Sequence, residues 1–332
     1  MIDIDQESAT SEGRASGDAG AYKDASSLLR GEDGVEFGSK HVNAAFKAGV
    51  TTAISAPITR GGVMAGLSAA FRTEASNAIE ETAFAKPVVA LHVQIGTSGR
   101  DASTSSVSAQ LAFLRGVFLA NIDKEPKENM YAAVTHGVMP LIVHAHNKDQ
   151  IAAAVRLRQE IRFACTKAGL KGDGMRLVIV GGAEAHLVAS ELAIEEIPVI
   201  LQPARCQPSS WETRHCLAGP PLTKHTGTQV LHAAGVQVGL AVDDIGDVRN
   251  LIWEAGWTIH NSHHAIHDVD AISMITWNVA KAFGIQDVAG GIRVGDKAEF
   301  VGYDGDPFAM STRIMLVVGG TRQGVTCYPE QA

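Results

Sequence analysis

The chain has 332 residues, of which 45% are hydrophobic and 19% are charged, and its formal net charge is −8 at pH 7. A chain of this length buries a large core, either as one big domain or as a domain with an appendage. Its pI is about 5.9 and its basic residues are scattered, which argues against a nucleic-acid-binding surface. The longest apolar runs have the length of strands, so we expect no membrane span.

The N-terminus and the cysteines indicate the compartment. Residues 1–7 are acidic and lack the basic and apolar regions of a signal peptide. Four cysteines are too few for a disulfide framework. Cys206 and Cys216 flank one loop and are near enough in sequence to meet, but free buried thiols are the favoured interpretation. We therefore expect a reduced, cytoplasmic setting.

The first third of the chain predicts a polar arm followed by mixed elements. Residues 1–34 are polar and rich in Gly, Ser and Asp, so we expect a loop or arm. Apolar residues at helical spacing predict a helix over 36–48, which Gly49 would end. Strands are predicted over 50–56, 66–72 and 87–96, and an amphipathic helix over 107–122.

From residue 140 onward strands and helices alternate. The predicted strands cover 140–143, 175–180, 198–201 and 236–242, and the predicted helices cover 149–168, 184–194, 226–234, 248–259 and 268–283. This alternation predicts a parallel sheet wrapped by helices. The strands add up to one fewer than the eight of a (β/α)8 TIM-like barrel. The tail from about residue 286 instead predicts short antiparallel strands, a small β appendage.

Two histidines follow the predicted strand 140–143 at its carboxyl end, where ligands and catalytic groups collect in parallel α/β proteins. His144 and His146 are two residues apart, so both point to the same face of an extended chain. Such a pair could bind a metal or hold a carboxylate. It could equally be a pair of hydrogen-bonded core histidines, and both interpretations stay open.

Two further residues end strands at the same edge of the sheet. His92 is a candidate ligand or base, and a strand residue satisfied by the backbone is the alternative. Asp243 ends the strand 236–242, where a carboxylate can take a proton from a metal-bound water and pass it to a leaving amine. A helix cap is the alternative role at this place, and Asp244 suits it.

A glycine pair gives a third, weaker hypothesis. Gly181-Gly182-Ala183-Glu184 follows a strand and opens a helix, which superficially suggests a dinucleotide site. The G-x-G-x-x-G spacing is absent, and no acidic residue ends the next strand. Glu184 in the first helical turn suits the helix dipole.

Together these stretches resemble the amidohydrolase superfamily, specifically its imidazolonepropionase-like and cyclic-imidopeptidase-like branch. The likeness runs from about residue 35 to 320, and its landmarks are Ala48-Gly-Val-Thr-Thr52, His144-Ala-His146 and Gly182-Ala-Glu184-Ala185. Near the end, residues 274–284 are similar to the family's T-x-N-x-A-x-x-L-G run. Residues 291–301 are similar to its G-x-I-x-x-G-x-x-A-D-L-V strand, with Glu299 in place of the aspartate.

The resemblance implies a metal-dependent (β/α)8 barrel over 35–285, beside a β-sandwich remnant over 286–332. It implies hydrolysis of non-peptide carbon–nitrogen bonds, including those of cyclic amides, by water that one or two divalent metals, often Zn²⁺, activate. Carried onto this chain, His144, His92 and Asp243 are the metal ligands. Asp243 also shuttles the proton, and His146 faces the substrate.

The chain also departs from the family pattern. The H-x-H motif after strand one has no counterpart, and residues 1–5 resemble the segment just downstream of it, so we expect strand one to be missing. His92 stands where many relatives have a bridging lysine, and Gly181 where they have a histidine. We expect a small amide as the substrate and expect the protein to bind neither nucleic acid nor membrane. The sequence leaves open whether the protein forms a homo-oligomer. A degenerate or truncated non-catalytic relative is the main alternative, and a dinucleotide-binding oxidoreductase the second.

Overall fold

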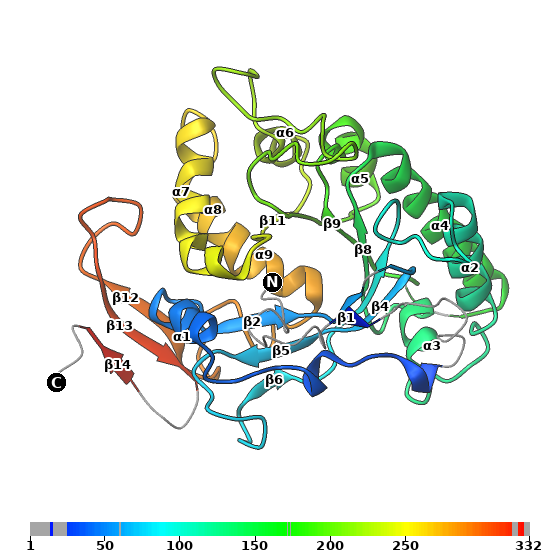
Figure 1. Ribbon diagram of the computed structural model, residues 1–332, viewed down its shortest axis with the longest axis horizontal. Coiled ribbons are helices and arrows are strands. Elements are labelled where there is room, and N and C mark those ends of the chain that lie inside the picture. Colours follow the sequence, from blue (N-terminus) through cyan, green and yellow to red (C-terminus); the bar gives the residue numbers. More distant parts are fainter. Residues whose placement is uncertain are drawn as a thin grey trace.

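A computed structural model describes residues 14–15, 25–59, 61–170, 172, 174–320 and 325–328. Its centre is a six-stranded sheet in the order β11-β10-β9-β8-β7-β4 (Figure 1). The strands are β4 (Met64–Leu67), β7 (Leu91–Gln94), β8 (Leu141–Ala145), β9 (Leu177–Gly181), β10 (Val199–Leu201) and β11 (Val238–Leu240). Strands β7 to β11 are parallel, and β4 is antiparallel to β7. The predicted parallel sheet is therefore present.

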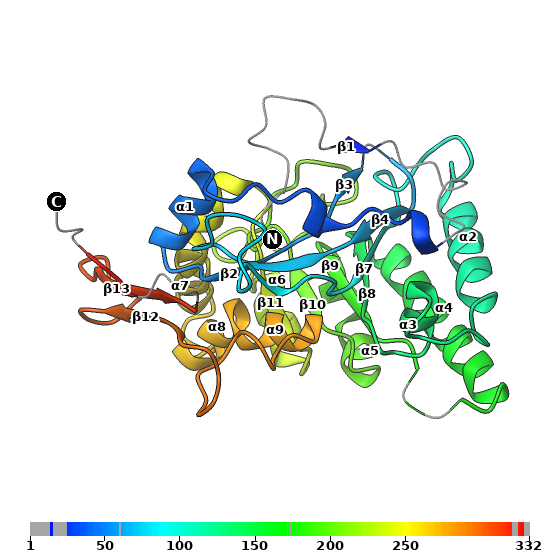
Figure 2. The same cartoon turned by 90° about the horizontal axis from the view of Figure 1, so that it is seen from below.

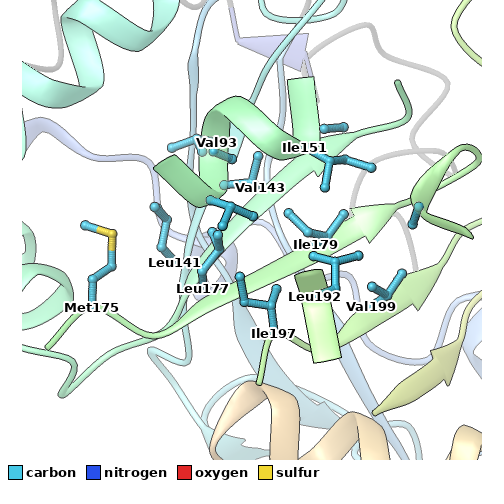
Figure 3. Close-up of a cluster of buried hydrophobic side chains, with 14 of the residues drawn as sticks. Val93, Leu141, Val143, Ile151, Met175, Leu177, Ile179, Leu192, Ile197 and Val199 are labelled. Atoms are coloured by element: carbon cyan, nitrogen blue, oxygen red, sulfur yellow. The ribbon is translucent and has the colours of Figure 1, made fainter. Parts of the chain in front are cut away.

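The two faces of this sheet are both apolar because helices or other strands cover each of them. Side chains such as Val143 and Ile179 point toward helices α4 (Lys148–Lys167) and α5 (Ala189–Ile194), where they pack on Ile151 and Leu192 (Figure 3). Alternate residues, among them Ile142, point to the other face of the sheet, which we call its inner face, and form a second cluster there. Burying one such side chain stabilises the fold by roughly 1.5–3 kcal/mol, so the strand ends are held firmly.

Polar side chains fix where the main helices begin. Ser106 caps α2 (Val107–Leu119), Asn129 caps α3 (Met130–Thr135), Asn147 caps α4, and Thr226 caps α6 (Gly227–Ala233), each accepting a hydrogen bond from a backbone N–H of the first turn. Helix α3 was not predicted because six residues are too short for a clear period. The remaining helical elements are α1 (Lys40–Lys47), α7 (Leu251–Asn261), α8 (Asp268–Ile275), α9 (Trp277–Phe283), and the 3-10 turns η3 (Ala25–Ser27), η4 (Gly31–Asp33), η5 (Ala185–Val188) and η6 (Ile245–Asn250).

One predicted strand is two strands in two different sheets. The stretch 66–72 divides between β4 and β5 (Ala69–Arg72), and β5 pairs with β2 (Thr52–Ser55) and β6 (Phe84–Lys86) in a separate antiparallel sheet. Gly66 has a φ of +127°, and a Cβ there would lie 2.6 Å from the carbonyl oxygen of Leu29. The chain therefore bends at a position that suits only glycine.

The central sheet does not close into a barrel within the described residues. It ends at β4 on one side and at β11 on the other, so the predicted TIM-like barrel is confirmed only as an α/β fold with a mixed, mainly parallel sheet. Short strands β1 (Arg14–Ala15) and β3 (Ile58–Thr59) pair apart from it. No helix among the described residues is long and apolar enough to cross a membrane.

The C-terminal segment forms a small antiparallel sheet at one end of the molecule (Figure 2). Its strands are β12 (Glu299–Tyr303), β13 (Ile314–Gly319) and β14 (Val325–Cys327). The sequence predicted antiparallel strands here, and its description as a sandwich remnant stays a prediction. The polar arm predicted over 1–34 lies largely outside the described residues.

Candidate active site

His92 and His144 lie against each other on the inner face of the sheet. His92 is fully buried in β7, and its Nδ1 is 2.9 Å from Nε2 of His144 in β8, so one ring donates a hydrogen bond to the other. Phe283 of α9 stacks on the His92 ring with centroids 6.0 Å apart. The sequence placed His92 at the end of its strand, which was wrong, because His92 is the second residue of β7 and pairs with Ile142. Its side chain nevertheless meets His144.

Burial controls the charge of this pair. Loss of water, together with a smaller contribution from the nearby His146, lowers the pKa of His144 to about 4. Burial also lowers the pKa of His92 well below its usual value, with His144 adding to the effect. Both rings are therefore neutral at pH 7. The Nε2 of His92 is buried with no hydrogen-bond partner among the described residues.

His146 follows β8 and faces a pocket. Burial lowers its pKa, while the carboxylates of Asp243 and Glu212 act in the opposite direction. Its Nδ1 is buried and has no hydrogen-bond partner within the described part of the chain. A buried polar atom of this kind is a candidate for binding a ligand atom, because leaving it unpaired is costly.

Asp243 and Asp244 follow β11 and have different tasks. The Oδ1 of Asp244 accepts a hydrogen bond of 2.7 Å from the N–H of Gly246 at the start of η6, so Asp244 is the predicted cap. Partial desolvation raises the pKa of the Asp243 carboxyl, and His146 lowers it. The Asp243 side chain is exposed, so solvent screens these effects. Asp243 thus remains available for proton transfer near His146.

The pocket beside His146 is open to solvent. Gly181 and Leu201 line it from the ends of β9 and β10, and Trp257 lines it from α7. The loop between β10 and α6 supplies Cys206 and Thr213. It therefore lies at the carboxyl ends of parallel strands, which is where this architecture places its ligands.

Glycine at position 181 makes room for His146. Gly181 has a φ of +100°, and a Cβ built there would be 2.8 Å from Cε1 of His146. A side chain at this position would displace the imidazole. The His146 ring thus lies against the end of β9, where relatives in the resembled family carry a histidine. The same packing leaves little room for a dinucleotide phosphate at the turn that follows Gly181.

Sequence reasoning missed how Glu184 acts. It is fully buried, and its Oε2 accepts hydrogen bonds of 2.8 Å from Asn147 Nδ2 and 3.0 Å from Lys148 N. Its own N–H donates to the carbonyl of His146 at 2.8 Å. Glu184 therefore fixes the turn that carries His146, whereas the sequence suggested only a favourable place in the helix dipole.

Comparison with known proteins identifies the family. The sequence profile of the amidohydrolase family matches residues 15–326. The chain belongs to the amidohydrolase family. It is 30% identical over 336 residues to amidohydrolase tasK of Hapsidospora irregularis, covering 91% of this chain and 33% of that protein. This amidohydrolase chain thus spans about a third of the length of that curated relative.

A solved structure supports the fold of this amidohydrolase. The amidohydrolase from Thermotoga maritima MSB8 superimposes with a TM-score of 0.68 at 19% identity, covering 87% of this chain and 76% of that one. At this level of identity the likeness concerns the fold alone.

The metal site predicted for this amidohydrolase is not assembled by the described residues. The nitrogens of His92 and His144 converge, but the described residues contain no group of three His, Cys, Asp or Glu side chains placed to hold a metal ion. Three protein ligands are the usual minimum for a catalytic zinc site. Within the described residues the converging donors are fewer than that number.

Proposed function

We propose that this amidohydrolase hydrolyses a carbon–nitrogen bond of a small, non-peptide or cyclic amide in the pocket beside His146. The observation that carries the proposal is the buried Nδ1 of His146, which has no hydrogen-bond partner among the described residues. The His146 side chain lines the pocket at the carboxyl ends of the parallel strands and interacts with the Asp243 carboxylate. Family membership supports the reaction class.

In this proposal His146 binds and Asp243 transfers the proton. With a hydrogen on Nδ1, the neutral His146 ring donates a hydrogen bond to the amide carbonyl oxygen and polarises it. Asp243 takes a proton from the attacking water as the carbon–oxygen bond forms. It then returns that proton to the nitrogen as the carbon–nitrogen bond breaks. The products are a carboxylic acid and an amine.

Glu184 holds this arrangement in place. Its bonds to Asn147 and Lys148 secure the start of α4, and its N–H holds the His146 carbonyl. Water can reach Asp243 because the side chain is exposed. In this proposal a small amide in the pocket would be held by His146, while the solvated Asp243 carboxylate acts from beside the His146 ring.

A divalent metal, with Zn²⁺ as first candidate, stays part of the proposal as a property expected from the family resemblance. Elemental analysis of purified protein, with His144→Ala as the matched variant, tests it directly. About one metal per chain that is lost in the variant supports a site built on His144. Metal at the same level in both proteins would contradict that assignment.

A second candidate function is ligand binding without hydrolysis. The observation that favours it is the packing of Gly181 against His146, which leaves no room for a further histidine at that strand end. Small amides would then bind the pocket and be recovered intact. Mass spectrometry of an amide after long incubation with the protein separates the two functions, because hydrolysis adds one water to a cyclic amide and splits a linear one into an acid and an amine.

We also propose that the protein acts in the cytoplasm.

A further inference from the structure

The loop from residue 202 to 226 contains a ring closed by a disulfide. Cys206 and Cys216 are bonded, with Cα atoms 5.3 Å apart, so the prediction of free thiols at these positions was wrong. Both cysteines and Thr213 line the pocket together with His146. The ring therefore forms part of the wall between the pocket and solvent. Figure 1 shows this segment near α6, in yellow-green.

Two residues of the ring, Glu212 and His215, make polar contacts with the rest of the fold. Oε1 of Glu212 accepts hydrogen bonds from the N–H of Thr97 at 3.1 Å and from Nε2 of Gln150 at 2.6 Å. On the other side, Nδ1 of His215 lies 3.0 Å from Oε1 of Glu184. These contacts reach the loop after β7, helix α4 and the turn after β9. The ring thus bridges several of the strand ends that surround the pocket.

Little apolar packing supports the ring. Of its residues only Thr213 is buried, and Trp211 at its tip is 77% exposed. The guanidinium of Arg214 lies 3.8 Å from the Trp211 ring centroid, which is a contact within the ring itself. Because so little of the ring is buried, it depends on its disulfide and its polar contacts.

We propose that the ring 206–216 is a redox-sensitive lid over the pocket, which a dithiol reductant opens. A thiolate of the dithiol attacks one sulfur, and the other cysteine leaves as a thiolate that takes up a proton. The second thiol of the reductant then displaces the first cysteine, which also becomes a thiol. Two electrons and two protons pass to the protein, and the dithiol becomes a cyclic disulfide.

Reduction opens the lid because it removes the covalent constraint on a segment with few other supports. The freed chain gains many conformations, and the Glu212 contacts with Thr97 and Gln150 must then be made at a larger entropic cost. That this lid covers a substrate pocket rests on the proposed function; the redox response of the ring does not.

Hydrogen–deuterium exchange tests the proposal without any need for turnover. The reporter is the Thr97 amide, which Glu212 of the ring protects, and the internal control is the Ala132 amide at the start of α3, which Asn129 protects. With dithiothreitol we expect exchange in the segment containing Thr97 to accelerate at least tenfold, while exchange at Ala132 is unchanged. Alkylation followed by mass measurement verifies that the disulfide has been reduced.

Three variants make the result specific. Cys206→Ser/Cys216→Ser exchanges fast at Thr97 without reductant and does not respond to it. Glu212→Gln exchanges faster while the disulfide is intact. Cys165→Ala, which removes a buried free thiol, responds to dithiothreitol as the parent does.

Slow exchange at Thr97 after verified reduction would overturn the lid. Fast exchange after reduction, in a protein that hydrolyses no amide, would keep the lid and reject the proposed function. Amide hydrolysis whose KM does not change on reduction, together with unchanged exchange at Thr97, would keep the proposed function and reject the lid.

Discussion

At the scale of single residues, the two neighbouring aspartates after β11 offer a matched test. We expect Asp243→Asn to lower kcat by about 10²–10⁴-fold, because an amide cannot carry the proton from water to the leaving nitrogen. KM should change little, since His146 still binds the carbonyl. Steady-state assays of both constants measure the effect.

The control is Asp244→Asn, one residue away. Asparagine caps a helix as well as aspartate does, so activity and stability should stay near the parental values. Equal losses of kcat in the two variants would indicate a charge effect at this edge and not proton transfer by Asp243.

The buried histidine pair makes stability depend on pH. Its rings stay neutral in the folded protein at pH values where the unfolded chain already binds protons, because burial lowers the pKa of His144 from 6.5 to about 4. The free energy of unfolding should therefore fall as the pH drops from about 6.5 toward 4. The slope is ~1.4 kcal/mol per pH unit for each proton that the unfolded chain alone takes up.

Urea unfolding between pH 7.5 and 4.5 measures this slope, with His144→Gln as the comparison. The variant has one fewer ring to protonate on unfolding, so its stability should depend less steeply on pH. Parallel curves for the two proteins would show that His144 is not held neutral by the fold.

At the scale of elements, the end of β9 combines a left-handed backbone with close packing. Gly181→Ala should reduce stability by more than the roughly 1–2 kcal/mol of a left-handed alanine, because the new Cβ meets His146. Ligand binding in the pocket should weaken as well. Thermal unfolding and binding titration follow the two effects.

Gly169→Ala is the matched control for this variant. Gly169 follows α4 with a φ of +79°, and a Cβ there has no neighbour within 4 Å. Its cost should come from the backbone alone, with the pocket unaffected. Similar losses for both glycines would mean that His146 moves aside freely.

The strands and helices could largely be predicted, whereas their assignment to sheets could not. Apolar periods predicted α2 and α4 to within a few residues. The division of 66–72 between two sheets involves pairing with strands far away in sequence, since β4 pairs with β7 and β5 pairs with β2 and β6. The contacts of Glu212 with Thr97 and Gln150 are equally non-local, so no local pattern indicated that the loop covers the pocket.

The candidate site could be predicted only in part, because it also depends on contacts between residues far apart in sequence. The rule that strand ends gather at one edge brought His92, His144, His146 and Asp243 to attention. Local spacing does not determine which side chains meet, and the described structure joins His92 to His144 without bringing Asp243 into a metal site with them.

At the scale of the whole molecule, a buried ion pair joins the C-terminal sheet to the β2-β5-β6 sheet. Arg72 of β5 pairs with Glu299 of β12, and Thr52 of β2 donates a 2.6 Å hydrogen bond to the same carboxylate. Glu299 stands where the family pattern has an aspartate. We expect Glu299→Gln to cost more than about 1 kcal/mol but less than the roughly 3–5 kcal/mol of a fully broken buried pair, because Glu74 still acts on the buried Arg72 charge.

The exposed pair between Arg115 and Glu160 provides the comparison. Glu160→Gln should change the free energy of unfolding by no more than about 1 kcal/mol, because solvent already screens that pair. Chemical denaturation of both variants measures the difference. A cost for Glu299→Gln as small as that for Glu160→Gln would show that the two sheets are joined by apolar packing alone.

Amide hydrolysis by His146 and Asp243 is tested by measuring the amine groups formed from a panel of small linear and cyclic amides. The proteins compared are the parent, His146→Ala and Asp243→Asn, each with and without added Zn²⁺. We expect the parent to form amine from at least one amide, His146→Ala mainly to raise KM and Asp243→Asn mainly to lower kcat. Amine release that is equal in all three proteins, or no release from any amide under either condition, would contradict the proposal.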